Sequence, residues 1–213
     1  MKAMRIKAIL CAALAGALAV AAPAQAAVTI SQGHVDAIDV DWTGWALTLD
    51  LRDGTVTPAV DRAPADVVLQ AVPASRTTVP SGAAYAFLGN AGDPVWILPQ
   101  SQASGVLWPG FSTEGVPSGV LQGDNVAVRL VSVTGPADFS VYTTNSFGQP
   151  TVWFDSGNGL PDSRTLAIAT HAHANWAFEA AGTYTAVFEV TATTAGGTAV
   201  TSGRQSYQFT VQP

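Results

Sequence analysis

The sequence predicts an all-β protein, and two observations support this prediction. Short runs rich in Val, Thr, Ile and aromatic residues follow one another along most of the chain, separated by Gly, Pro, Asp and Asn. No ten-residue stretch beyond the N-terminal segment has the apolar periodicity of an amphipathic helix, and only residues 63–72 could hold a helical turn or two.

The clearest strand pattern covers residues 45–52. Apolar side chains occupy its odd positions and mostly polar ones its even positions, which places one face inward and the other in water. Asp53-Gly54 then indicates a turn. Further strands are expected at residues 67–72, 95–98, 126–133, 139–143, 151–154, 166–170, 184–191 and 206–211.

A Gly-x-Tyr motif refines the fold class. Gly182-Thr183-Tyr184 stands at the entrance to a predicted strand, which is the spacing of a tyrosine corner in immunoglobulin-like sandwiches. Residues 73–123 are rich in Gly, Pro and Ser and are expected to form long ordered loops. The prediction is therefore a single immunoglobulin-like antiparallel β-sandwich domain over residues 27–213, with long inserted loops.

The first 26 residues predict a secretory signal peptide. Lys2, Arg5 and Lys7 precede an alanine-rich apolar run at residues 8–22, and Ala24-Gln25-Ala26 is a cleavage signal. A retained membrane anchor is the alternative, but the run is shorter than the roughly 20 residues that a spanning helix needs. We therefore expect a secreted, cell-envelope-associated protein with no membrane span after cleavage. The single cysteine lies within this segment, so disulfides and thiolate ligands are not expected in the domain.

The charge of residues 27–213 limits the classes of partner. Once the three basic residues of the signal are removed, six arginines and no lysine stand against 15 acidic residues, which gives a formal charge of −9. Such a chain should repel nucleic acid and anionic membranes. Cations, glycans and other proteins remain as candidate partners.

Three histidines are the strongest candidates for chemistry. They fall in two short polar segments, Gly33-His34-Val35-Asp36 and His171-Ala172-His173-Ala174-Asn175-Trp176. Residues two apart on an extended backbone point to the same side, so the members of each segment should project together. If the two segments lie on neighbouring strands, the predicted metal ligands are His34, Asp36, His171 and His173, with Asn175 and Trp176 in supporting positions. The alternative is that each histidine is a structural residue.

The donor types predict which ion would bind. Imidazole and carboxylate donors without thiolates suit zinc best, with copper or manganese as alternatives. The chain has no nucleophile elbow, phosphate loop or HExxH motif, so we expect no enzymatic activity. Six tryptophans could form a platform that stacks on sugar rings, although packing in the core is the more common use.

An ordered set of motifs spans about residues 28 to 190. The motifs are GHVD at 33–36, FLG at 87–89, PVWILPQ at 94–100, LWPG at 107–110, GP at 135–136, FSVY at 139–142, HAHANWAF at 171–178 and GTY at 182–184. This set resembles a known family, the actinobacterial surface-anchored protein domain, also described as the choice-of-anchor M domain, which is an ABC transporter-associated repeat family. It implies an extracellular domain linked to transporters that import metals such as zinc or manganese. The chain departs from the family pattern in having one copy and no visible anchor.

Two functions follow as hypotheses. The first is a non-catalytic extracellular cell-envelope protein that binds a divalent metal through the three-histidine site and is associated with ABC transporter components. The second is a structural or adhesive cell-surface module that binds wall glycan or a partner protein.

Overall fold

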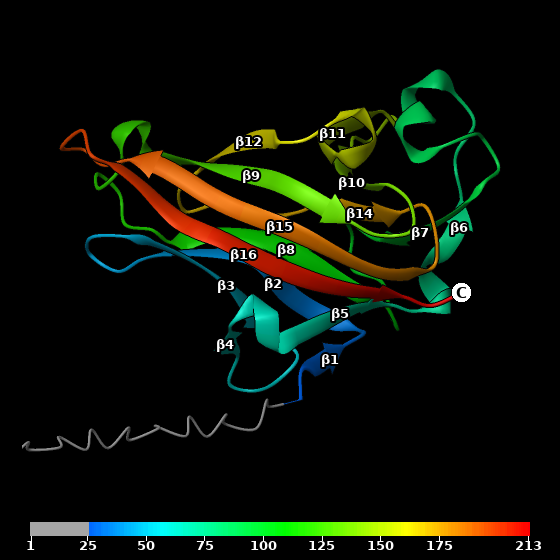
Figure 1. Cartoon of the computed structure of the whole chain (residues 1–213), viewed down its shortest axis with the longest axis horizontal. Helices are drawn as coiled ribbons and strands as arrows, with labels where there is room; N and C mark the ends of the chain where they lie inside the picture. Colours follow the sequence, from blue (N-terminus) through cyan, green and yellow to red (C-terminus); the bar gives the residue numbers. More distant parts are fainter. Residues whose placement is uncertain (1–25) are drawn as a thin grey trace, which may run out of the picture.

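A computed structural model describes residues 26–213, and almost all of the expected signal peptide, residues 1–26, lies outside them. Within the described range the chain forms sixteen β-strands and five short 3-10 helices (Figure 1). The prediction of an all-β class is confirmed. No helix in this range has the length and apolar character needed to cross a membrane.

The largest sheet holds six strands and contains the long strands β15 and β16 (Figure 1). At the edge formed by the first strand of the chain, three successive strands run parallel to one another, and the remaining pairings of this sheet are antiparallel. In spatial order the strands are β1 (Val28–Ile30), β5 (Val67–Ala71), β16 (Ala199–Val211), β15 (Gly182–Thr193), β9 (Asn125–Thr134) and β12 (Asp162–Ala167).

A second, wholly antiparallel sheet has five strands. In spatial order they are β11 (Pro150–Asp155), β10 (Phe139–Thr144), β14 (Asn175–Phe178), β7 (Pro94–Leu98) and β6 (Arg76–Thr78).

The third sheet carries the histidines and also has five strands. In spatial order they are β13 (His171–His173), β8 (Leu107–Gly115), β2 (Gly33–Trp42), β3 (Leu47–Asp53) and β4 (Val60–Arg62). Here β2 and β8 are parallel. The expectation of purely antiparallel sheets is therefore wrong for three pairings, β1 with β5, β5 with β16, and β2 with β8. These strands are far apart in the sequence, as parallel neighbours must be.

Strands from all three sheets share one hydrophobic core. Alternate residues of β15 and β16 point inward, as the predicted period of two requires. Trp176 of β14 is fully buried and packs against four aromatic rings drawn from all three sheets, with ring centroids 5.2 to 6.0 Å away. The rings around it belong to Phe111, Phe139, Phe188 and Phe209.

Tyr184 makes the contacts that the Gly-x-Tyr motif predicts. Its hydroxyl donates to the carbonyl of Ala180 at 3.0 Å and accepts from the amide of the same residue at 3.1 Å. Gly135 lies beneath the ring, where an added Cβ would collide with it. A hydrogen bond from a buried tyrosine to the backbone a few residues upstream defines a tyrosine corner.

Two sequence predictions differ from the structure. The strand expected at residues 166–170 ends early, because β12 stops at Ala167 and Ala169 takes a left-handed conformation with φ 54° that turns the chain toward β13. The loops expected at residues 73–123 contain β8, a strand of nine residues. Pro109 and Gly110 resemble a turn in the sequence, yet both lie inside β8. In residues 63–72 the helical part is one short 3-10 turn, η1 (Pro64–Asp66).

Candidate metal centre

The strand that carries His34 contains a β-bulge. Asp36 of β2 pairs with Gly110 of β8, and Ile38 pairs with the very next residue of β8, so Ala37 is inserted. An inserted residue reverses the alternation of side chains beyond it. Polar residues therefore line the same groove from both sides of the bulge, and they are His34, Asp36, Asp39 and Asp41.

The two histidine-bearing strands flank the same central strand. β13 sets His173 opposite Gly110, and β2 sets Asp36 opposite the same Gly110. Strands on either side of a shared neighbour lie about 9.6 Å apart, and Gly110 leaves the space between them without a side chain. A Cβ added to Gly110 would lie 2.8 Å from Cε1 of His173 and 2.9 Å from Oδ1 of Asp36. Side chains from β13 and β2, the two neighbours of β8, thus meet above Gly110.

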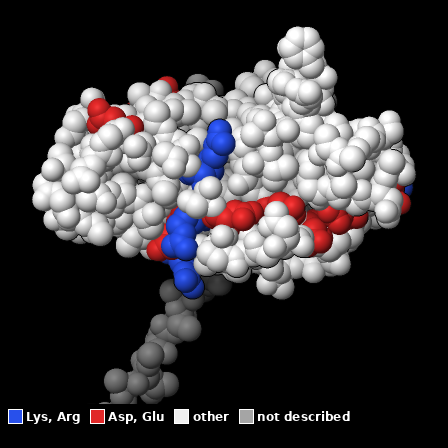
Figure 2. All heavy atoms as spheres, turned by 90° about the horizontal axis from the view of Figure 1, so that it is seen from above, with Lys and Arg blue, Asp and Glu red and all other residues white. Residues whose placement is uncertain are grey.

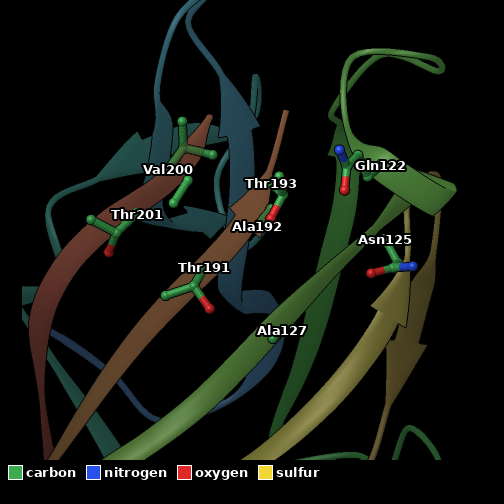
Figure 3. Close-up of a pocket in the computed structure, with 9 residues that line it drawn as sticks. Gln122, Asn125, Ala127, Thr191, Ala192, Thr193, Val200 and Thr201 are labelled. Carbon is green, nitrogen blue, oxygen red and sulfur yellow. The ribbon is translucent and has the colours of Figure 1, made fainter. Parts of the chain in front are cut away.

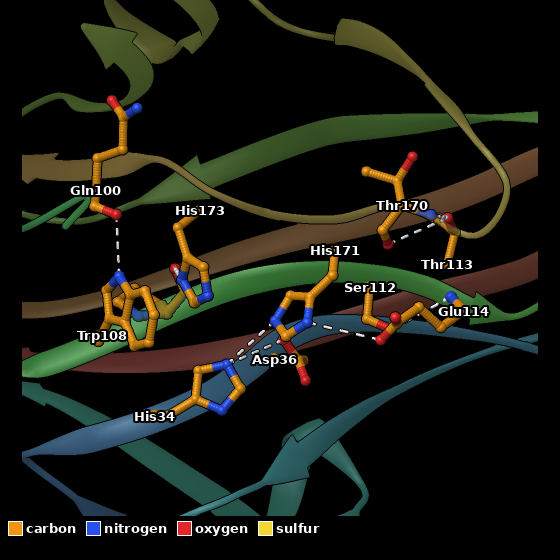
Figure 4. Close-up of polar contacts among 11 residues, drawn as sticks. His34, Asp36, Gln100, Trp108, Ser112, Thr113, Glu114, Thr170, His171 and His173 are labelled. Carbon is orange, nitrogen blue, oxygen red and sulfur yellow. Dashed lines mark hydrogen bonds and ion pairs between the residues drawn. The ribbon is translucent and has the colours of Figure 1, made fainter. Parts of the chain in front are cut away.

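Four donor residues converge there, as Figure 4 shows. Nε2 of His34 lies 3.2 Å from Nε2 of His171, and these nitrogens lie 3.4 and 2.9 Å from Oδ1 of Asp36. With His173 included, one donor atom from each residue lies within 4.8 Å of all the others. The predicted adjacency of the two segments is therefore present, and the cluster could hold a metal ion.

The short distances match the geometry of a shared ion. Ligands at the corners of a tetrahedron, each 2.0 to 2.1 Å from zinc, are about 3.3 to 3.4 Å apart. The triangle formed by His34, His171 and Asp36 has edges of 3.2, 3.4 and 2.9 Å. His173 of β13, the strand that also carries His171, supplies the fourth donor.

Asp36 is the member of the cluster whose burial has no compensating hydrogen bond at Oδ1. The residue is 4% exposed, and within residues 26–213 its Oδ1 has no hydrogen-bond partner, although it lies 2.9 Å from Nε2 of His171. A buried carboxylate oxygen without a partner is costly. A cation at the centre of the cluster would remove that cost.

Contacts outside the cluster orient two of the imidazoles. Nδ1–H of His173 donates a hydrogen bond to the carbonyl of Pro109 at 3.0 Å, which leaves Nε2 free for a ligand role. The same ring stacks on Trp108, with centroids 3.7 Å apart and planes 11° apart. Nδ1 of His171 lies 3.6 Å from the carboxylate of Glu114. Trp108 in turn donates to the carbonyl of Gln100 at 3.0 Å (Figure 4).

The surroundings of His173 favour the neutral form of its imidazole, which is the form that can bind a metal. Burial lowers the pKa of His173, and the nearby His34 and His171 act in the same direction, while the hydrogen bond to Pro109 opposes them. A lowered pKa keeps the imidazole neutral near pH 7, and only the neutral ring offers a lone pair.

Asn175 and Trp176 do not have the supporting positions expected for them. The amide oxygen of Asn175 accepts from the backbone of Gln100 at 2.8 Å, and its nitrogen donates to Thr144 at 3.3 Å. Trp176 is buried in the core. The alternation fails because β13 ends at His173 and the chain passes into β14, which belongs to another sheet. Sequence reasoning instead missed Trp108, Glu114 and Gly110, which lie on β8, a strand it did not predict.

An acidic groove leads away from the cluster. It has a volume of about 470 Å³ and is lined by three members of the cluster, His34, Asp36 and His171, and by Ser112, Glu114, Asp39, Asp41, Asp61 and Arg52. Burial, with smaller contributions from Asp41, Asp36 and Asp61, raises the pKa of Asp39 to about 7, although a hydrogen bond from Ser112 opposes the shift. Carboxylates are therefore crowded beside the donors, and Asp39 carries its full negative charge only above pH 7 or when a cation lies nearby.

Two other hollows in the described part of the chain lack this combination of groups. One of them, about 570 Å³, is lined by Gln122, Asn125 and small residues of β9, β15 and β16, and its lining includes no ionisable side chain (Figure 3). A band of acidic side chains lies on the side where β11 and β12 run (Figure 2). A second acidic hollow is lined by Asp138, Asp155 and Glu179, but there Asp155 and Asp138 already accept hydrogen bonds from Gly157 and Ser156.

Comparison of the chain with protein-family models, with curated proteins and with solved structures finds no match. The resemblance to the choice-of-anchor M domain therefore stays a prediction from the motifs, and the case for a function depends on the site itself.

Proposed function

We propose that this protein is a non-catalytic, extracellular cell-envelope protein that binds one divalent metal ion, zinc in the first place, through His34, Asp36, His171 and His173. The observation that carries the proposal is the triangle of donor atoms with edges of 2.9 to 3.4 Å, one corner of which is a buried carboxylate oxygen without a hydrogen-bond partner.

The donor set supports zinc over other ions. Three imidazoles and one carboxylate match the nitrogen and oxygen ligands of tetrahedral zinc sites, and copper or manganese are the next candidates. Four protein ligands would fill a tetrahedral ion and leave no position for a substrate. This supports a role in holding or passing on the ion rather than in catalysis.

The location and partners are part of the same proposal. The signal-like first 26 residues support export, and the motif resemblance supports a cell-envelope domain that works with metal-importing ABC transporter components. The corner formed by Tyr184 and Ala180 supports an immunoglobulin-like character for the sandwich of residues 27–213.

Metal titration tests the proposal. Protein stripped with a chelator should take up about one equivalent of Zn²⁺, measured by calorimetry and by elemental analysis after gel filtration. The chain has three histidines, all in the cluster, so the His171→Ala/His173→Ala variant should lose uptake while keeping its β-type circular dichroism. Gln122→Ala, an exposed change outside the site, is the control. Full uptake by the double variant would refute the proposal.

Exposed aromatic side chains favour a second candidate, an adhesive module that binds wall glycan or a partner protein. Trp45, in the β2–β3 connection, is 78% exposed, and Phe147, in the β10–β11 connection, is 88% exposed. Such rings can stack on sugars. Retention on cell-wall material separates the candidates, because adhesion through these rings should survive a chelator and be lost in Trp45→Ala/Phe147→Ala.

A further inference from the structure

We propose that the acidic groove is the route by which the metal enters, and that the site takes it as a free hydrated divalent cation and excludes negatively charged metal complexes. This inference rests on the proposed metal function and names the chemical form of the ligand.

The groove carries excess negative charge next to the donors. Its lining includes five carboxylates, those of Asp36, Asp39, Asp41, Asp61 and Glu114, against one arginine. That arginine is already paired, because Nη1 of Arg52 lies 2.7 Å from Oδ1 of Asp61. Four carboxylates are left without a cationic partner among the groove's own side chains, apart from the imidazoles.

A β-bulge places two of these carboxylates close to the donors. The bulge at Ala37 sets Asp39 and Asp41 in the same groove as His34 and Asp36, although the simple alternation of β2 would have turned them into the core. Asp39 is 5% exposed, so the charge that it carries when ionised acts in a region of weak solvent screening.

An independent observation identifies a cation as the occupant. Oδ1 of Asp36 is buried, faces the imidazole nitrogens and has no hydrogen-bond partner. An anionic group at this point would meet a carboxylate oxygen and two imidazole lone pairs. A positively charged ion satisfies all of them.

The expected consequence is electrostatic steering. A cleft lined by one sign of charge raises the local concentration of the opposite ion and its association rate by about 10- to 1,000-fold. Added salt screens the effect, because the Debye length falls from about 30 Å at 0.01 M to about 3 Å at 1 M. Metal complexes of net negative charge would meet the same field as a barrier.

Stopped-flow mixing of the full protein with Zn²⁺ tests the inference. Between about 10 and 300 mM salt, the association rate constant of the wild type should fall by at least about fivefold. Asp39→Asn/Asp41→Asn should show a low-salt rate lower by at least about fivefold while still binding one equivalent. Asp66→Asn/Asp93→Asn makes the same number of Asp-to-Asn changes outside the groove and should leave the rate unchanged.

A second arm needs no variant. When zinc is offered to an excess of protein as its nitrilotriacetate complex, which is an anion, the rate constant of transfer should not exceed that at which the complex releases free zinc, whatever the protein concentration. A transfer rate constant that rises in proportion to the protein concentration, or wild-type association that is insensitive to salt, would overturn the entry route while leaving the metal site intact. Absence of any zinc uptake would instead refute the proposed function.

Discussion

Gly110→Ala is the most direct test of how the site is built. The new Cβ would lie 2.8 Å from Cε1 of His173 and 2.9 Å from Oδ1 of Asp36. Ordinary contacts between carbon atoms begin at about 3.5 Å, so each side chain must move away from the new Cβ by about half an ångström. The two side chains come from strands on opposite sides of β8, and the retreat therefore pulls two donors apart.

The size of the effect follows from the tolerance of metal coordination. Ligand distances in functional sites hold to within about 0.2 Å, which is less than the displacement that Gly110→Ala imposes. Disturbing the groups that position a ligand typically costs about 10- to 100-fold in affinity, or about 1.4 to 2.8 kcal/mol. Overpacking costs a folded protein about 1 to 3 kcal/mol. The variant should therefore stay folded and bind zinc more weakly.

Competition with a chromogenic chelator gives the zinc dissociation constant, and urea unfolding without metal gives the stability. Gly196→Ala is the matched control, because its Cβ would have no neighbour closer than 3.8 Å and its backbone is not left-handed. If folded Gly110→Ala binds zinc as tightly as the wild type, the donors do not converge above Gly110, and the reasoning fails.

Two further changes test the charges of the protein. Asp36→Asn should raise the free energy of unfolding of the metal-free protein by about 1 kcal/mol, because it removes a buried carboxylate oxygen without a partner. The same change should weaken zinc binding by at least about 100-fold. A lower metal-free stability would contradict this prediction. Burial, with smaller contributions from Asp138, Asp155 and Asp93, raises the pKa of Glu179 from its usual 4.5 to about 7. The ionised form therefore destabilises the folded state as pH rises from 4.5 through 7. Glu179→Gln should therefore stabilise the protein by about 1 to 2 kcal/mol at pH 8, after allowing for solvent screening of a partly exposed group, and by almost nothing at pH 4; equal gains in urea unfolding at both pH values would show that the shift is absent.

Periodicity predicted most of the strands because a half-buried strand must alternate. The run at residues 45–52 corresponds to β3, and the run at 184–191 corresponds to the centre of β15. β8 escaped prediction because its sequence, Leu-Trp-Pro-Gly-Phe, breaks the pattern. Pro109 and Gly110 occur in a central strand here because one supplies a carbonyl to His173 and the other leaves room for the donors.

The candidate site was predictable in composition but not in arrangement. The His-x-His spacing of 171 and 173 sets two imidazoles on one side of a strand, and the four candidate ligands do lie together. Their adjacency depends on β2 and β13 sharing a neighbour, which is a property of the topology. The bulge at Ala37 could have been suspected, because the polar positions change from even to odd across two consecutive apolar residues.

Two buried aspartates of the same sheet, Asp53 and Asp36, differ in their hydrogen bonds, and this difference distinguishes a structural residue from a candidate ligand. Asp53 of β3 is 1% exposed and accepts hydrogen bonds from the amide and hydroxyl of Thr55 and from Nε of Arg62. The sheet can thus saturate a buried carboxylate with donors where the carboxylate is structural. Asp36 is almost as deeply buried, yet Oδ1 faces two imidazole nitrogens that lie 3.2 Å from each other. A single N–H placed on either nitrogen can serve only one of these contacts, whereas one cation serves all three at once.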